Sequence, residues 1–145
     1  MGVYSIGRRT TNTTSGQAAM DVAVSSGQRL TVWEWQILLA APTASTYGLN
    51  RATAIGTRTT PTALLQEDAA DPAPSGIVLV DSALAHSVQP TLSTDYLRRV
   101  ALPATIGAGV FWTFPRGLKI AVSLSLVLQN LASNGVLDSS VVTEV

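Results

Sequence analysis

A chain of 145 residues whose nine basic and nine acidic residues make up 12% of its length has the size of one domain and about half the charge usual in a soluble one. It has no basic run long enough to bind nucleic acid by neutralising phosphates, so nucleic acid is not expected as a partner. Because cysteine is absent, disulfide frameworks and thiolate zinc sites are excluded.

The N-terminal part of the chain predicts strands separated by polar segments. Residues 3–6 form a short strand, and the polar residues 8–17 are expected to form an arm or loop. We therefore divide the chain into an N-terminal strand and arm, residues 1–17, and a single β-sandwich domain, residues 18–145. Residues 18–24 alternate with a period of two between mostly larger apolar residues and small or acidic ones, and residues 29–40 also alternate, which predicts a strand over each segment. Residues 46–55 can form another strand, in which Gly48 suggests a bulge or a close contact.

One short helix is expected near the middle of the chain. Thr60 is a helix-capping residue type, Pro61 fits the first turn of a helix, and residues 63–67 are mostly helix formers. The following residues, 68–76, contain two prolines and a glycine and predict an irregular loop. A further strand is expected over residues 77–88.

The C-terminal part predicts strands joined by short turns. Strands are expected over residues 96–102, 109–114, 118–131 and 136–145. Residues 114–117, Phe-Pro-Arg-Gly, have proline at the second position of a turn, so they predict the turn between the second and third of these strands. Asn134-Gly135 is a strong hairpin signal and is expected to join the last two strands.

These eight or nine strands, with a turn signal about every ten residues, favour an all-β fold, an antiparallel β-sandwich or jelly roll with at most one short helix.

The apolar run over residues 118–131 is too short, and too often broken by polar residues, to span a bilayer. The first residues of the chain contain no apolar stretch long enough for a signal peptide, which points to synthesis in a bacterial cytoplasm.

His86 is the single histidine of the chain, so a histidine-rich metal site is excluded. Asp81 with Ser82 or Ser87 would complete a nominal Ser-His-Asp arrangement, but the sequence around these serines is not that of a nucleophile elbow. We expect His86 to be a surface or hydrogen-bonded residue. The sequence predicts no catalytic residue, no metal site and no cofactor.

Glu67, Asp68 and Asp71 lie in one expected loop and carry the carboxylate oxygens that calcium prefers. Their spacing does not match a calcium-binding loop, and charged residues collect in solvated loops by default. A solvated loop is the favoured interpretation, and ion binding by the loop stays open.

Trp33, Glu34 and Trp35 place an acidic residue between two aromatic residues on one expected strand. Alternation puts both tryptophans on the same face, where they either fill the core of the sandwich or stack on a sugar. We favour the core, with Glu34 facing solvent or a neighbouring subunit.

Two pairs of arginines are candidates for contact with a partner. Arg8 and Arg9 lie at the start of the polar arm, where they could clamp an acidic surface. Arg98 and Arg99 share a strand, so their side chains point to opposite faces. One of these two must face the interior side or a subunit interface, where its charge would need a carboxylate partner.

Five stretches of the chain combine strands with glycine- and proline-containing turns: YSI at 4–6, RTTNTT at 9–14, TASTYGL at 43–49, RRVALP at 98–103 and GAGVFWTFPRGL at 107–118. With them, most of the chain resembles a family of small structural proteins of tailed bacteriophages, of the head-decoration or cement type. The shared motifs shape strands and turns and are not the signature of an active site.

The resemblance implies a β-sandwich subunit, a homotrimer, that sits on the outer surface of the virion capsid and ties neighbouring major capsid proteins together. It implies no enzymatic activity and no small-molecule substrate. The charge-poor surface, rich in serine and threonine, suits a chain that packs against other subunits. The candidate intersubunit or capsid contacts lie in the arm, the arginine strand and the aromatic hairpin, and they are Arg8, Arg9, Thr11, Asn12, Arg98, Arg99, Phe111, Trp112 and Arg116.

Two other functions stay open at this point. A carbohydrate-binding module would expose Trp33, Trp35 or Trp112 on one face. A tail or head-completion component would form a ring, and would differ from a cement protein in stoichiometry and position.

Overall fold

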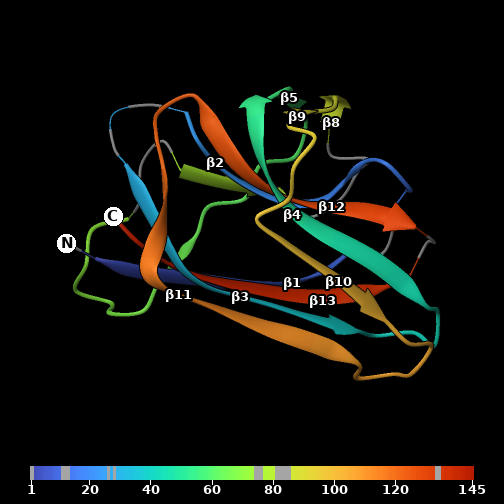
Figure 1. Ribbon diagram of the computed structural model, residues 1–145. Coiled ribbons are helices and arrows are strands. Elements are labelled where there is room, and N and C mark those ends of the chain that lie inside the picture. The colour runs from blue at the N-terminus through green and yellow to red at the C-terminus, as the bar shows by residue number, and fades with distance from the viewer. Residues whose placement is uncertain are drawn as a thin grey trace.

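All regular secondary structure in the described part of the chain is β, as the computed structural model of the protein shows (Figure 1). The structure describes residues 2–10, 14–25, 27, 29–73, 86–132 and 135–145, together with the backbone of residues 77–80. Two antiparallel sheets pack face to face, so the expected all-β antiparallel sandwich is confirmed.

One sheet has five strands. In the order in which they pair, these are β11 (Gly109–Ile120), β3 (Leu30–Leu39), β13 (Leu137–Glu144), β1 (Val3–Thr10) and β6 (Leu65–Gln66). All neighbouring strands are antiparallel, and β13 lies in the middle of the sheet between β3 and β1. The two edges of this sheet are therefore β11 and β6.

The other sheet has six strands. Five of them pair in the order β10 (Arg98–Leu102), β4 (Ser45–Ala54), β12 (Leu124–Ala132), β2 (Ala18–Val24) and β7 (Ile77–Val80), and β9 (Thr91–Leu92) pairs with β4. A separate two-stranded ribbon is formed by β5 (Thr57–Arg58) and β8 (His86–Val88). The segment between β4 and β10 thus carries the ribbon and β9 in addition to β6 and β7.

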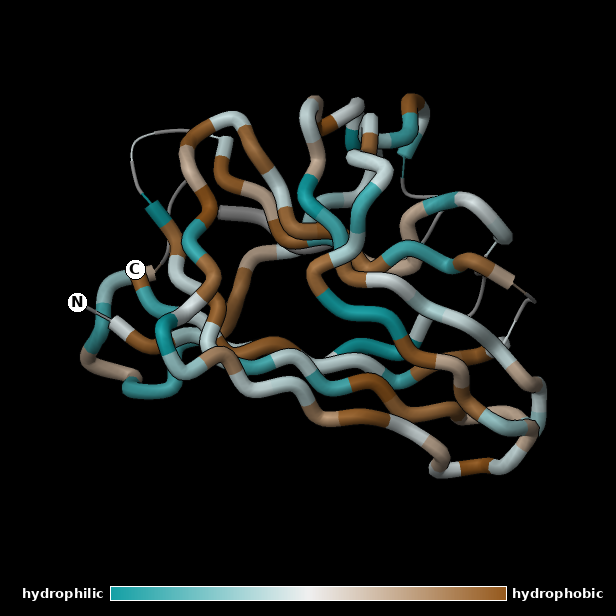
Figure 2. The backbone as a smooth tube through the Cα atoms, viewed as in Figure 1, coloured by the Kyte–Doolittle hydropathy of each residue, from teal (hydrophilic) through white to brown (hydrophobic). Residues whose placement is uncertain are grey.

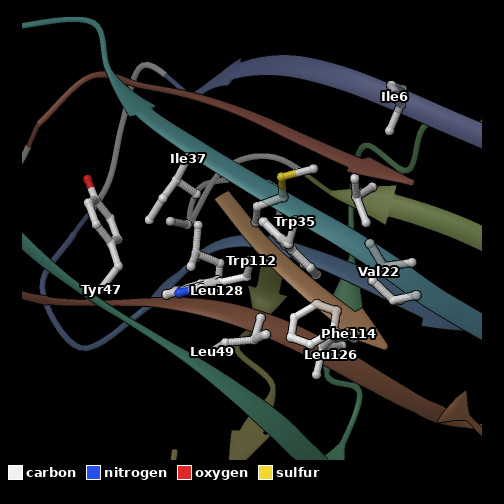
Figure 3. Close-up of a cluster of buried hydrophobic side chains, with 14 of the residues drawn as sticks. Ile6, Val22, Trp35, Ile37, Tyr47, Leu49, Trp112, Phe114, Leu126 and Leu128 are labelled. Carbon is white, nitrogen blue, oxygen red and sulfur yellow. The ribbon is translucent and has the colours of Figure 1, made fainter. Parts of the chain in front are cut away.

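The core lies between the two sheets and is built from large apolar side chains of both (Figure 3). Trp35 and Trp112 come from the five-stranded sheet and are 0% and 9% exposed, and Tyr47, Leu49 and Leu128 of the other sheet are fully buried. Hydrophobic and hydrophilic residues alternate along strands of both layers (Figure 2). Each fully buried side chain of this size contributes about 1.5–3 kcal/mol of hydrophobic stabilisation.

The short helix expected after Thr60 is a wrong prediction, because residues 60–67 contain no helix. Leu65 and Gln66 form β6 and pair with β1, and Leu64 is buried in the core. A helix of five or so residues is marginal by itself, so strand pairing and the burial of one leucine outweigh its propensity.

The polar arm expected over residues 8–17 begins later than predicted. Residues 8–10 belong to β1 and pair in register with β13, so for them the expectation of an arm is wrong. Thr11 and Asn12 lie outside the described residues. The backbone of Gly16 donates to the Asn130 oxygen at 2.7 Å, which ties the end of this segment to β12. Strand β1 thus lies inside the five-stranded sheet, between β13 and β6.

The turn expected at residues 114–117 is instead a bulge inside β11. Pairing between β11 and β3 stops after Thr113 and resumes at Leu118. Gly117 has a φ of 64°, a left-handed conformation that glycine adopts without strain. The chain reverses later, at residues 121–123, where it passes from the five-stranded sheet to β12 of the other sheet. Proline and glycine mark bulges as well as turns, so this prediction placed the reversal too early.

Two further connections differ from the expected ones. Strand β12 pairs with β4 and β2, whereas β13 pairs with β3 and β1, so the segment after Ala132 crosses between sheets and the hairpin pairing expected for Asn134-Gly135 is wrong. Asn134 itself lies outside the described residues. The single strand expected over residues 77–88 is divided between β7 and β8, which pair with different partners, and residues 81–85 are not described.

Strand β3 has an extra residue that separates the two tryptophans expected on one face. In its pairing with β13, one additional residue lies between Val32 and Glu34. This bulge shifts the alternation by one position, so Trp35 is buried in the core, whereas Trp33 is only half-buried. The indole Nε1 of Trp33 donates to Glu144 Oε2 at 2.9 Å. The expectation that both tryptophans share a face is therefore wrong.

Candidate functional site

The aromatic residues predicted to contact a partner divide between surface and core according to the face of β11 that they occupy. Phe111 is 53% exposed, whereas the next residue, Trp112, lies in the core. In the pairing with β3, Phe111 lies opposite Gln36, a residue of the outer face, and Trp112 lies opposite the buried Trp35. The segment therefore offers one large aromatic side chain to a partner, and not two.

Arg98 and Arg99 each lie over an aromatic ring. The guanidinium carbon of Arg98 is 5.7 Å from the centre of the Phe114 ring, and that of Arg99 is 5.9 Å from the centre of the Tyr96 ring. Arg98 Nη1 also donates to the Leu97 oxygen at 2.7 Å. The expected carboxylate partner is replaced, among the described residues, by ring faces and a backbone oxygen, which can stabilise a partly solvated cation.

An open groove lies where β10, an edge of one sheet, approaches the bulge of β11, an edge of the other. We call it the basic groove. Its volume is about 340 Å³, and its lining residues are Arg98, Phe114, Pro115, Arg116, Gly117 and Leu118. Two arginines thus meet three apolar side chains in one concave site, an arrangement suited to an anionic group that also has an apolar part. The structure brings together Arg98 and Arg116, which the sequence had suggested separately.

Two further basic residues, Arg51 and Lys119, meet directly after the groove residue Leu118. Arg51 Nη1 donates to the Lys119 oxygen at 2.7 Å, which ties β4 to the end of β11. Arg98 and Arg116 in the groove, with Arg51 and Lys119 beside it, are four of the nine basic residues of the chain. The neutral chain therefore has an uneven charge distribution.

The acidic residues Glu67, Asp68 and Asp71 lie in a loop that directly follows β6, and we call residues 67–71 the acidic loop. Asp68 Oδ1 accepts a hydrogen bond from the Ala70 nitrogen at 2.8 Å, and the Asp71 nitrogen donates to the Asp68 oxygen at 3.0 Å. The Glu67 nitrogen donates to the oxygen of Val3 at 2.9 Å, which anchors the loop to β1. Within the described ranges, no three histidine, aspartate or glutamate side chains gather as a metal site.

Arg9, expected to clamp a partner, is paired within the chain. Its Nε and Nη2 donate to the two carboxylate oxygens of Asp138, both at 2.7 Å. These hydrogen bonds lower the pKa of the Asp138 carboxyl below its ordinary value, and the carboxylate raises the pKa of Arg9. A hollow of about 230 Å³, also lined by Arg8, lies beside the pair where Gly7 has no side chain. The pair is exposed, so it stabilises the fold only slightly.

A buried charged cluster lies on the other side of the molecule, beneath the β5–β8 ribbon. Arg58 Nη2 of the ribbon lies 2.6 Å from Asp21 Oδ2 of β2, and the side chains are 8% and 0% exposed. His86 Nε2 lies 3.4 Å from the same carboxylate oxygen, and its side chain is fully buried. The pairing of Arg58 with His86 in the ribbon brings both next to Asp21. The cluster joins the ribbon to the outer face of the six-stranded sheet.

Sequence reasoning missed this cluster, although one signal pointed to it. Asp21 is the single charged residue in the otherwise apolar strand Ala18–Val24, and a buried carboxylate requires a partner. The partner could not be identified from the sequence, because Arg58 is 37 residues away. The nominal Ser-His-Asp arrangement, which the sequence did not favour, is not assembled by the described residues: Ser87 is exposed and donates to the Thr57 oxygen at 3.5 Å, while Asp81 and Ser82 are not described.

Comparison with known protein families, with curated proteins and with solved structures finds no match to this chain. In the part of the chain that the structure describes, no helix has the length and apolar character needed to cross a membrane.

Proposed function

We propose that this chain is a non-enzymatic structural protein of a bacteriophage virion, a decoration subunit that binds the outer surface of the head and stabilises contacts between major capsid proteins. In this proposal the subunit is a homotrimer that acts without a cofactor or a small-molecule substrate, and its partners include neither nucleic acid nor a membrane. It is made in the host cytoplasm and works on the outer capsid surface.

The observation that carries the proposal is the exposed edge formed by β11. Phe111 projects from the outer face of this edge strand, where it can contact the capsid, and the basic groove, with Arg98 and Arg116, lies farther along it as a separate site for contact between subunits. Arginine and aromatic side chains are enriched where proteins bind one another, and a few such residues supply most of the affinity. An oligomer that presents this edge several times can bind a repeating lattice strongly even when each contact is weak.

The carbohydrate-binding alternative has less support. It requires an exposed tryptophan, but Trp35 and Trp112 lie in the core. Trp33 is half-buried, and its indole nitrogen already donates to Glu144.

Light scattering of the purified chain, followed by co-sedimentation with phage heads assembled without it, tests the proposal. We expect a stable trimer that saturates the heads at a fixed ratio. Replacing Phe111 with serine should weaken head binding about tenfold or more, as expected for an interface anchor. The matched control is Val122→Ser, which alters another exposed apolar residue, in the reversal after β11.

A monomer that does not sediment with heads would refute the proposed function. Equal head binding by the wild type and by Phe111→Ser would remove the β11 edge from the contact.

A further inference from the structure

The two edges of the five-stranded sheet carry opposite charge. At the β11 edge, Arg98 and Arg116 line the basic groove, and Lys119 follows it in sequence. At the β6 edge, the acidic loop carries three carboxylates, those of Glu67, Asp68 and Asp71. Because the positive and negative charges of the whole chain cancel to a net charge of zero, the net charge does not reveal this separation.

The arginines of the groove have no carboxylate partner within the described part of the chain. The ion pairs found there join Asp138 to Arg9 and Asp21 to Arg58, and His86 also lies next to Asp21. Arg98 contacts the Phe114 ring and a backbone oxygen instead. Guanidinium groups bind carboxylates strongly, often through two parallel hydrogen bonds, so an acidic side chain is the occupant that this groove fits.

The acidic loop has the complementary features. Glu67 and Asp68 are exposed, and the internal hydrogen bonds of the loop hold its backbone in one shape. Leu65, two residues before the loop, is 64% exposed on the same edge. An apolar side chain beside carboxylates matches the apolar walls that Phe114 and Leu118 give the groove.

The two features also lie at the same height along the strands. One line of paired residues crosses the whole sheet, through Thr113, Glu34, Val142, Ser5 and Leu65. The β11 bulge begins directly after the first of these residues, and the acidic loop begins two residues after the last. Four strand spacings, about 19 Å, separate the two edges. A second copy placed beside the first needs little shift along the strands to bring its acidic loop to the groove.

We propose that the acidic loop of one copy binds in the basic groove of the next, so that the chain associates with itself head to tail through opposite edges of the five-stranded sheet. Such a contact is heterologous: each copy uses one groove and one loop, and the copies form a closed ring or an open row according to the angle between them. The inference rests on the proposed function only in that both require self-association, and its test does not use phage heads.

Charge reversal on each edge tests the contact. One variant carries Arg98→Glu with Arg116→Glu. The other carries Glu67→Lys and Asp71→Lys with Asp68→Asn, which changes the loop from three negative charges to two positive ones, and asparagine keeps the side-chain oxygen that accepts from Ala70. We expect the wild type to have a mass that is a multiple of 15.1 kDa and each variant to be a monomer. Every contact between the two variants is complementary, so an equimolar mixture should associate again. In the mixture the two variants must alternate, and alternating copies cannot close a ring with an odd number of members. Any mass above that of the monomer therefore counts as restored association.

Two controls separate the contact from a loss of folding. Replacing both arginines of the groove, Arg98 and Arg116, with lysine keeps the charge but not the paired hydrogen bonds, and should weaken the association far less than replacing them with glutamate. Arg116→Glu alone changes a side chain for which the described residues supply no hydrogen bond or ion pair, so its circular dichroism spectrum should match the wild type while its association is weakened. Added salt should weaken wild-type association as well, because the contact is exposed to solvent.

A monomeric wild type, unchanged association in both charge-reversed variants, or a mixture of folded variants that stays monomeric would each overturn the inference. If a monomeric wild type binds heads, the inference of head-to-tail association is overturned, but the proposal that the chain binds the capsid is not. A head-to-tail oligomer that ignores heads would support the interface and overturn the proposed function.

Discussion

Replacing Asp21 with leucine tests whether the buried cluster holds the β5–β8 ribbon on the sheet. The substitution removes the carboxylate that lies 2.6 Å from Arg58 Nη2 and 3.4 Å from His86 Nε2. Arg58 is then left with a buried charge and without its partner. The matched control adds Arg58→Met, which removes the stranded cation and keeps a long side chain in its place.

We expect Asp21→Leu alone to lose much of the free energy of unfolding, and the double variant Asp21→Leu with Arg58→Met to lose little. Breaking a buried ion pair by removing one partner costs about 3–5 kcal/mol, whereas replacing both partners with apolar residues is often neutral or stabilising. The apolar cluster on this outer face is small, with Ala18, Ala52 and Val127 buried and Leu92 partly buried. If the ribbon opens and Arg58 reaches solvent, the loss is limited to the free energy of that opening.

Urea unfolding followed by tryptophan fluorescence measures the global effect, because Trp35 and Trp112 are core residues. A fall in the midpoint at unchanged slope reports lost stability, and a lower slope reports that the ribbon has already opened. Hydrogen exchange at residues 57–58 and 86–88 measures the local effect. An Asp21→Leu variant within about 1 kcal/mol of the wild type, with the ribbon still protected, would refute the reasoning, because the loss would lie well below that of a broken buried pair.

The bulges and the surface ion pair can be examined in the same unfolding assay. Trp35→Ala should cost about 3–5 kcal/mol and Trp33→Ala clearly less, since only the first opens a core cavity; equal losses would contradict the bulge in β3. Gly117→Ala should cost about 1–2 kcal/mol, because φ is 64° and an added Cβ meets the Thr31 side chain, and an unchanged midpoint would contradict that conformation. Arg9 lowers the pKa of Asp138 in the folded state. The contribution of this ion pair to the free energy of unfolding is therefore fully present above the pKa that Asp138 has in the unfolded state, and it is lost as the pH falls through the folded-state pKa. Wild type and Asp138→Asn should therefore converge in stability at acid pH, and a difference that does not change with pH would exclude this ion pair as its cause.

The class of fold follows from local patterns such as that of residues 30–39. A strand repeats every two residues, and a half-buried sheet needs apolar side chains on one face, so the alternation is readable without knowledge of the partner strand. The strand over residues 18–24 was predicted with the bounds that the structure has, and the strand over 29–40 differs by one residue at each end.

Bulges and sheet crossings could not be predicted in the same way. Pro115 and Gly117 favour a turn and a bulge alike, and the choice depends on β3, which pairs with β11 on both sides of the interruption. In β3 itself, nothing in the local sequence marks Trp33 as the residue at which the alternation shifts. Asn134-Gly135 suits a hairpin, but β13 gains two partners, β3 and β1, by crossing to the other sheet.

In the candidate site, too, the sequence indicated the residue types and the tertiary structure decided how they are arranged. Arg98 and Arg116 were candidates by residue type, but only the approach of β10 to the β11 bulge places them in one groove. Phe111 and Trp112 were predicted as a pair, and the strand directs them to opposite faces. Arg9 was expected to be available to a partner, and Asp138, 129 residues away, neutralises it.

By itself, then, the sequence determined an all-β antiparallel sandwich, the approximate position of most strands, and the charge-poor surface, because these depend on residue type and on a period of two along the chain. Only the tertiary structure decided which sheet each strand joins, which tryptophan is buried, and which charged groups meet in the basic groove and beneath the ribbon. Those outcomes depend on contacts between residues far apart in sequence, whose register is set by the packing of the whole sandwich and not by any local segment.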